Sequence, residues 1–147
     1  MSRFIRISAL ALSALMLSAC SILPEPEQLH VYRLPGTAPS VSTLATPSPM
    51  TLQVNRPSSN QILDSSRIVV LPDGNQVSTY QGVRWSDRAP TMLRDRLIDS
   101  FISANSFAAV SSDDNHLQTD LQLVSTLRAF QSEYRNDAPQ VQIQLDV

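Results

Sequence analysis

Polar and apolar residues alternate with a period of two along the last part of the chain. This is the pattern of β-strands that bury one face, because successive side chains point to opposite sides of a sheet. From Leu117 to Tyr134, one face of the predicted strand carries Leu117, Thr119, Leu121, Leu123, Ser125, Leu127 and Ala129. After a turn at residues 135–139, the apolar positions are Val141, Ile143, Leu145 and Val147. We therefore predict a long antiparallel hairpin with one apolar face.

Shorter segments of the same kind predict further strands earlier in the chain. One of them ends at the sequence Pro-Asp-Gly-Asn, which is typical of a hairpin turn. Pro72 presets φ in such a turn, and Gly74 accepts a positive φ. The predicted strands before the final hairpin are residues 29–34, 50–54, 67–71, 76–80 and 107–110.

One segment has the period of a helix instead. Its apolar stripe consists of Leu93, Leu97 and Phe101 at positions i, i+4 and i+8, with Ile98 and Ile102 beside them. We predict a helix over residues 91–104 whose stripe packs on the sheet. Ser86 or Asp87 is expected to cap it, and Pro90 is tolerated in the first turn. The charged residues around the other side are expected to be solvated: Arg94, Asp95, Arg96 and Asp99.

Together these elements predict an α+β domain, with a mostly antiparallel sheet and one major helix packed on one face. The chain has 147 residues, of which 42% are hydrophobic, so one modest core is expected over residues 29–147. The last residue lies inside a predicted strand. We expect either that the sequence is C-terminally incomplete or that a partner covers this edge, and the edge also allows a homo-oligomer.

The first 20 residues carry the pattern of a bacterial lipoprotein signal. Arg3 and Arg6 precede an apolar run that ends in Leu17-Ser18-Ala19-Cys20, a lipobox with small residues before the sole cysteine. The apolar run is shorter than the roughly 20 residues that a membrane-spanning helix needs. We therefore predict a signal peptide over residues 1–19, a covalent lipid on Cys20 and a tether over residues 20–28. The alternatives are a secreted protein whose cysteine falls here by chance and a buried core thiol.

The residue after the lipobox bears on location. Bacterial lipoproteins that stay at the inner membrane typically carry an aspartate there, whereas this chain has Ser21. By that resemblance the protein is expected at the periplasmic face of the outer membrane rather than at the inner membrane. The short tether reaches only about 25 Å, so the domain is expected to sit close to its membrane.

Charge and composition argue against several classes of function. All 11 basic residues are arginines, against 13 acidic residues, and the formal net charge is −2, which argues against nucleic-acid binding. His30 and His116 lie far apart with no cysteine partner, and Asp113 and Asp114 lack the spacing of a calcium loop. No metal and no cofactor are therefore predicted, apart from the lipid on Cys20.

The sequence also lacks the motifs of common enzymes. With three glycines in all, it has no Walker loop and no nucleophile elbow, so we expect a non-catalytic protein. A hydrolase that uses His30 or His116 stays open as an alternative.

Several positions, taken in order, resemble one known family. They are the lipobox at Cys20, the strand around Tyr32, the set Tyr80, Gly82 and Trp85 before the helix, and residues 130–134 followed by Pro139 and the final alternation. This set is similar to that of the ABC-type transport auxiliary lipoproteins, whose members typically continue with a further strand and a C-terminal helix. The resemblance implies a non-catalytic accessory of a transport system that includes an ABC permease, an ATPase and a mammalian-cell-entry (MCE) domain protein. Such systems move lipids or other hydrophobic molecules between the inner and outer membranes.

Two aromatic residues are predicted to contact such a partner. Tyr80 and Trp85 lie just before the predicted helix, and aromatic side chains are common anchors at protein interfaces. The alternative is that both fill the core between sheet and helix. A second hypothesis for the whole protein is a structural or assembly-factor lipoprotein that binds outer-membrane proteins or peptidoglycan.

Overall fold

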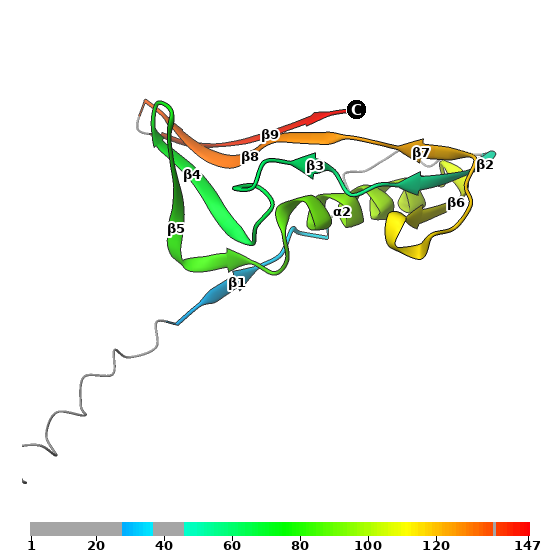
Figure 1. Ribbon diagram of the computed structural model, residues 1–147, viewed down its shortest axis with the longest axis horizontal. Coiled ribbons are helices and arrows are strands. Elements are labelled where there is room, and N and C mark those ends of the chain that lie inside the picture. The colour runs from blue at the N-terminus through cyan, green and yellow to red at the C-terminus, as the bar shows by residue number, and fades with distance from the viewer. Residues whose placement is uncertain (1–27, 37–45, 137) are drawn as a thin grey trace, which may run out of the picture.

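The strands that the structure describes form two sheets, and a helix packs against both of them (Figure 1). The computed structural model describes residues 28–36, 46–136 and 138–147. The helix is α2 (Ala89–Ser103), whose first half packs on the larger sheet through Ala89 and Leu93. Its last turn brings Phe101 against Phe107 at the start of the smaller sheet, with ring centroids 5.8 Å apart.

The larger sheet has six strands and confirms the α+β class. Its order is β1-β5-β4-β8-β3, and β9 pairs with β8 along the other edge of that strand. The longest strands belong to two antiparallel hairpins, β4–β5 and β8–β9, and parallel pairs join the remaining strands. The bounds are β1 (His30–Tyr32), β3 (Ser58–Ser59), β4 (Arg67–Asp73), β5 (Gln76–Trp85), β8 (Thr126–Arg135) and β9 (Ala138–Asp146).

The smaller sheet corrects the prediction of one continuous strand over residues 117–134. Its order is β6-β2-β7, all parallel, with β2 (Ser48–Val54), β6 (Phe107–Ser112) and β7 (Leu121–Leu123). The predicted strand is divided at Val124 and Ser125, so that β7 belongs to this sheet and β8 to the larger one. The neighbouring chain is interrupted at the same level by the buried Pro57, which has no N–H for the ladder. The alternation along residues 117–134 cannot predict this break, because the interruption lies in a neighbouring segment of the chain.

The predicted antiparallel hairpin is confirmed as β8–β9, but part of β8 presents different side chains to the apolar face than the sequence predicts. The β8–β9 register shifts between Leu127 and Ala129, where two steps along β8 oppose one step along β9. This bulge moves the alternation by one residue. Phe130, rather than the predicted Ala129, therefore shares the face of Leu127 and pairs with Ile143.

The helix begins earlier than predicted and is capped differently. Its N-cap is Arg88, whose side chain makes no capping hydrogen bond, and Pro90 lies in the first turn as expected. The expected cap by Ser86 or Asp87 is wrong, because both residues precede Arg88, which occupies the N-cap position. Asp87 instead accepts a hydrogen bond from the Arg88 amide at 2.6 Å. Within the predicted stripe, Ile102 is exposed near the end of the helix, beyond the larger sheet.

Arg94 is the main exception to the predicted solvated face of the helix. Its side chain is 7% exposed and makes ion pairs with Asp113 at 2.8 Å and Asp114 at 2.7 Å. Both aspartates belong to the 3₁₀ turn η2 (Asp113–Asn115) that follows β6. Asp95 completes the cluster at 2.9 Å. At Arg94 the helix thus contacts the chain after β6 instead of water, whereas Asp95 and Asp99 on the same helix stay mostly exposed, as predicted.

The centre of the larger sheet forms the core. Leu63, Val69, Ala89, Leu127 and Phe130 are buried together, and Trp85 packs against them with its ring 5.6 Å from that of Phe130. β5 changes direction on its way to Trp85 (Figure 1), and Gly82 in this stretch has a φ of 67°. A positive φ is easy only for glycine, so Gly82 lets the strand turn its end toward the helix.

Candidate functional site

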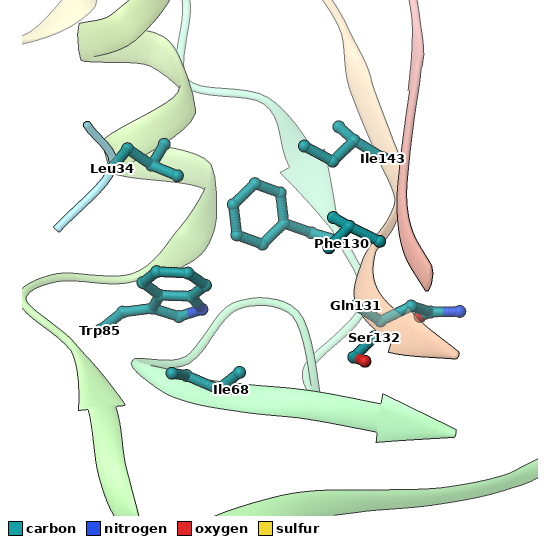
Figure 2. Close-up of a pocket in the computed structure, with 8 residues that line it drawn as sticks. Leu34, Ile68, Trp85, Phe130, Gln131, Ser132 and Ile143 are labelled. Atoms are coloured by element: carbon teal, nitrogen blue, oxygen red, sulfur yellow. The ribbon is translucent and has the colours of Figure 1, made fainter. Parts of the chain in front are cut away.

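A small apolar pocket lies between the helix side of the molecule and the β8–β9 hairpin. Its volume is about 170 Å³. Figure 2 shows Leu34, Ile68, Trp85 and Phe130 pointing toward one another around it, with Ile143 beside them. The full lining is Leu34, Ile68, Trp85, Phe130, Gln131, Ser132, Val141 and Ile143.

Strand register explains why these side chains meet. Phe130 pairs with Ile143 and Ser132 with Val141, and cross-strand partners point to the same side of a sheet. Ile68 comes from β4 on the other edge of β8, and Trp85 comes from the turned end of β5. The pocket therefore depends on two hairpins that are far apart in sequence, β4–β5 and β8–β9, and on the bulge that turns Phe130 inward.

The polar groups of the lining are almost all engaged with neighbours. The Tyr80 hydroxyl lies 3.4 Å from the Ser132 hydroxyl, and Gln131 donates to Glu133 at 2.8 Å. The exception is Nε1 of Trp85, a buried donor with no hydrogen-bond acceptor among the described residues. In Figure 2 this nitrogen lies on the edge of the indole ring that faces the middle of the pocket.

The mouth of the pocket is apolar and open to solvent. Val141 is 80% exposed and Ile143 is 53% exposed, although both line the pocket. Leu145, on the same face of β9, packs against the core. This face of β9 thus runs from partly buried at Leu145 to exposed at Val141.

Tyr80 and Trp85, the predicted partner contacts, have different surroundings. Trp85 is half-buried and packs against Phe130, which matches the alternative that it fills the core. Tyr80 is 37% exposed, and its hydroxyl lies 3.5 Å from that of Tyr134 on β8. Hydrogen bonds with Ser132 and Tyr134 lower the pKa of Tyr80, and the bond with Tyr80 raises the pKa of Tyr134. Ser132 connects the pocket with the pair of Tyr80 and Tyr134, because it lines the pocket and contacts the Tyr80 hydroxyl.

The acidic cluster around Arg94 has a structural role. Burial by itself would lower the pKa of Arg94, but hydrogen bonds with Asp113, Asp95 and Asp114 outweigh it and raise that pKa. Burial likewise works to raise the pKa of Asp113, and the Arg56 amide and the Arg94 guanidinium outweigh it and lower the pKa. The lowered pKa favours the ionised form of Asp113, whose ion pair with Arg94 ties α2 to η2.

The remaining predicted features divide into two groups. Leu17, Ser18, Ala19 and Cys20 lie outside the described residues, so lipidation of Cys20 stays a prediction. Among residues that the structure describes, no group of three metal-ligating side chains comes together. His30 lies exposed on β1 and His116 is exposed after η2. No helix in the described part of the chain has the length and apolar character to span a bilayer.

Comparisons with known proteins place this fold among relatives. The family described as "ABC-type transport auxiliary lipoprotein component" matches residues 32–147. The crystal structure of protein XCC0632 from Xanthomonas campestris is similar with a TM-score of 0.68 and 30% identity, over 78% of this chain. This chain spans 64% of the length of that protein. A crystal structure of an uncharacterized protein shares the fold, with a TM-score of 0.56 and 15% identity over 81% of this chain and 78% of the other. Among curated proteins, none matches significantly.

Proposed function

Because the chain belongs to the family of ABC-type transport auxiliary lipoproteins, we propose that it is a non-catalytic, lipid-anchored accessory of an ABC transport system. The system also contains an MCE-domain protein, a permease and an ATPase, and it moves lipids or other hydrophobic molecules between the two membranes. The observation that carries this proposal is the family match over residues 32–147.

The arrangement of polar groups supports a binding role rather than a catalytic one. The buried charged cluster is satisfied internally, since Arg94 contacts three carboxylates. The pocket is lined mainly by hydrocarbon side chains and presents one free donor, Trp85 Nε1. General acid–base chemistry needs a titratable group within hydrogen-bond reach of the substrate. A pocket of this kind is suited to holding an apolar group.

Cys20 provides the membrane anchor in this proposal. A protein held by several acyl chains is stably bound to a bilayer, whereas one chain binds only marginally. With a tether over residues 20–28, the first strand, β1, starts at His30 and lies near the membrane surface. We propose the periplasmic face of the outer membrane as the location, because Ser21 follows the lipidated cysteine.

Tyr80 is the residue that we propose for contact with the transport partner. It lies beside Tyr134 on an exposed part of the larger sheet, so two aromatic rings present a joint surface. Trp85 contributes indirectly in this proposal, because its packing against Phe130 holds the end of β5 in place.

Affinity capture of the full-length acylated protein from native membranes tests this function. We expect an MCE-domain protein or ABC transporter components to co-purify, and we expect their recovery to fall for Cys20→Ala. Tyr80→Ala is expected to reduce recovery, and Tyr32→Ala, which removes another exposed tyrosine on β1, is the matched control. Recovery of only peptidoglycan or β-barrel assembly proteins would contradict the proposal and support the second hypothesis, an envelope assembly or structural lipoprotein.

A further inference from the structure

We propose that one face of the larger sheet lies on the membrane surface, where Arg67 and Arg84 bind the headgroup phosphates of anionic phospholipids. This arginine face consists of Leu29, Val31, Arg67 and Arg84. The inference rests on the proposed lipid anchor and deepens it, because it states which side of the domain meets the bilayer.

Strand register places both arginines on the side of the sheet opposite the apolar pocket. Arg67 pairs with Arg84 across β4 and β5, and partners in an antiparallel pair point to the same side. Their chain neighbours Ile68 and Trp85 point into the pocket (Figure 2), and successive side chains alternate between the two sides of a sheet. In Figure 1, β1 and the end of β5 lie below α2, whereas the C-terminal end of β9 lies above it. The arginine face is therefore remote from the pocket and from the edge at β9.

The two arginines line a shared hollow of about 370 Å³. It lies at the bend of β5, and Leu29 and Gly82 contribute to its lining. Among the described residues that form this lining, none is acidic. A cavity of about 150 Å³ already holds one benzene molecule, so the hollow has room for a headgroup phosphate.

The charges of this pair are not neutralised within the described part of the chain. No carboxylate there forms an ion pair with Arg67 or Arg84, and both residues are exposed. Asp64, which lines a neighbouring hollow together with Arg67, pairs with Arg56 and Arg88 instead. Like charges directly opposite each other destabilise a strand pair, and a bound anion offsets that repulsion. The pair therefore favours a negatively charged ligand.

The tether favours a bilayer over an acidic protein as the source of that negative charge. Val31 pairs with Arg84 across β1 and β5, so the arginine face lies where the tether joins the domain. A tether over residues 20–28 reaches only about 25 Å, which keeps this face near the lipid on Cys20. Leu29 and Val31 are 50% and 51% exposed, and a bilayer surface takes up apolar and cationic side chains together.

A fluorescent label tests which side of the domain meets the bilayer. Cys20 is the sole cysteine and is acylated in this proposal, so Val31→Cys supplies the only free thiol for an environment-sensitive dye. The full-length acylated protein is placed in phosphatidylcholine vesicles with or without phosphatidylglycerol, in which some headgroups carry a nitroxide that quenches the dye at short range. Ile102→Cys, at a 58% exposed position near the end of α2, is the matched control for the label.

Two double substitutions test the role of the charges. Arg67→Gln with Arg84→Gln removes two charges from the arginine face, and Arg128→Gln with Arg135→Gln removes two exposed charges from β8. An arginine near an anionic bilayer strengthens binding about fivefold, so the first variant is expected to weaken contact between this face and the vesicle about 25-fold. The second variant is expected to change it less than twofold. Flotation with the vesicles reports the anchor, and far-ultraviolet circular dichroism checks that each variant is folded.

The outcomes are distinct. Quenching at Val31 that requires phosphatidylglycerol, exceeds that at Ile102 and is lost only in the double variant of the arginine face supports the proposal. Quenching that is absent, that is equal at both labels or in both lipid mixtures, or that responds equally to the two double variants overturns it and leaves an acidic protein as the partner of these arginines. A protein that does not float with the vesicles contradicts the anchor and this inference together. Capture of transport partners is a separate result, since they can co-purify whichever side of the domain meets the bilayer.

Discussion

Replacement of Arg94 by methionine measures how much the tie between α2 and η2 stabilises the fold. Methionine keeps the length and helix propensity of the side chain and removes the charge. Arg94 is almost fully buried, whereas Asp95 and Asp114 are mostly exposed and are solvated again when it is lost. The main loss is the bond to the half-buried Asp113, which then keeps the Arg56 amide and its own backbone amide as partners. A hydrogen bond between charged groups contributes about 1.5–3 kcal/mol, so we expect a loss of about 2 kcal/mol of unfolding free energy.

Urea unfolding followed by Trp85 fluorescence and circular dichroism provides the measurement. With an m-value of about 1–3 kcal/mol per molar urea, the midpoint is expected to fall by about 1 M. Arg96→Met is the matched control on the same helix. Its ion pair with the exposed Asp99 is 3.9 Å long, and such surface pairs contribute roughly 0–1 kcal/mol.

The pH dependence gives this prediction a second, independent test. The pKa of Asp113 is lowered in the folded protein, so its ionised form contributes stability above its unfolded pKa. That contribution is lost as the pH falls below about 4 toward the folded pKa. The difference between wild type and Arg94→Met is therefore expected to shrink in acid. Equal losses for Arg94→Met and Arg96→Met, or a difference that stays constant down to acid pH, would refute the reasoning.

Three further outcomes are expected from other parts of the chain. Gly82→Ala puts a Cβ on a residue with a φ of 67°, and should lower the unfolding free energy by about 1 kcal/mol in urea titrations. Phe130→Ala empties the core beside Trp85, and should cost about 3–5 kcal/mol and shift Trp85 emission to longer wavelength; Val141→Ala, at the exposed mouth, should cost less than about 0.5 kcal/mol. Cys20→Ala should abolish incorporation of radiolabelled palmitate and leave residues 1–19 attached by mass spectrometry, whereas Ser21→Ala should keep both the label and the cleavage.

Much of the local structure follows from the sequence because its cause is local. The β4–β5 turn falls at Gly74 and Asn75 and uses the positive φ of 49° at Gly74, as the glycine predicts, whereas Pro72 lies inside β4 instead of in the turn. The helix over residues 91–104 is recovered within two residues as α2, since its apolar period and Pro90 are properties of a short segment. The final hairpin and the apolar face of β9 follow from a period of two that needs no partner to be recognised.

Tertiary structure decides the features that depend on contacts between distant segments. The break at Val124, the bulge that turns Phe130 inward and the burial of Arg94 each depend on a neighbour that local patterns do not identify. The apolar pocket follows from the same cause, because β4, β5, β8 and β9 bring Ile68, Trp85, Phe130 and Ile143 together only in the assembled sheet. The sequence by itself determined the α+β class, the elements and the family resemblance. Packing determined where a charged helix residue is buried and where an apolar cavity stays open, because both depend on which strands become neighbours.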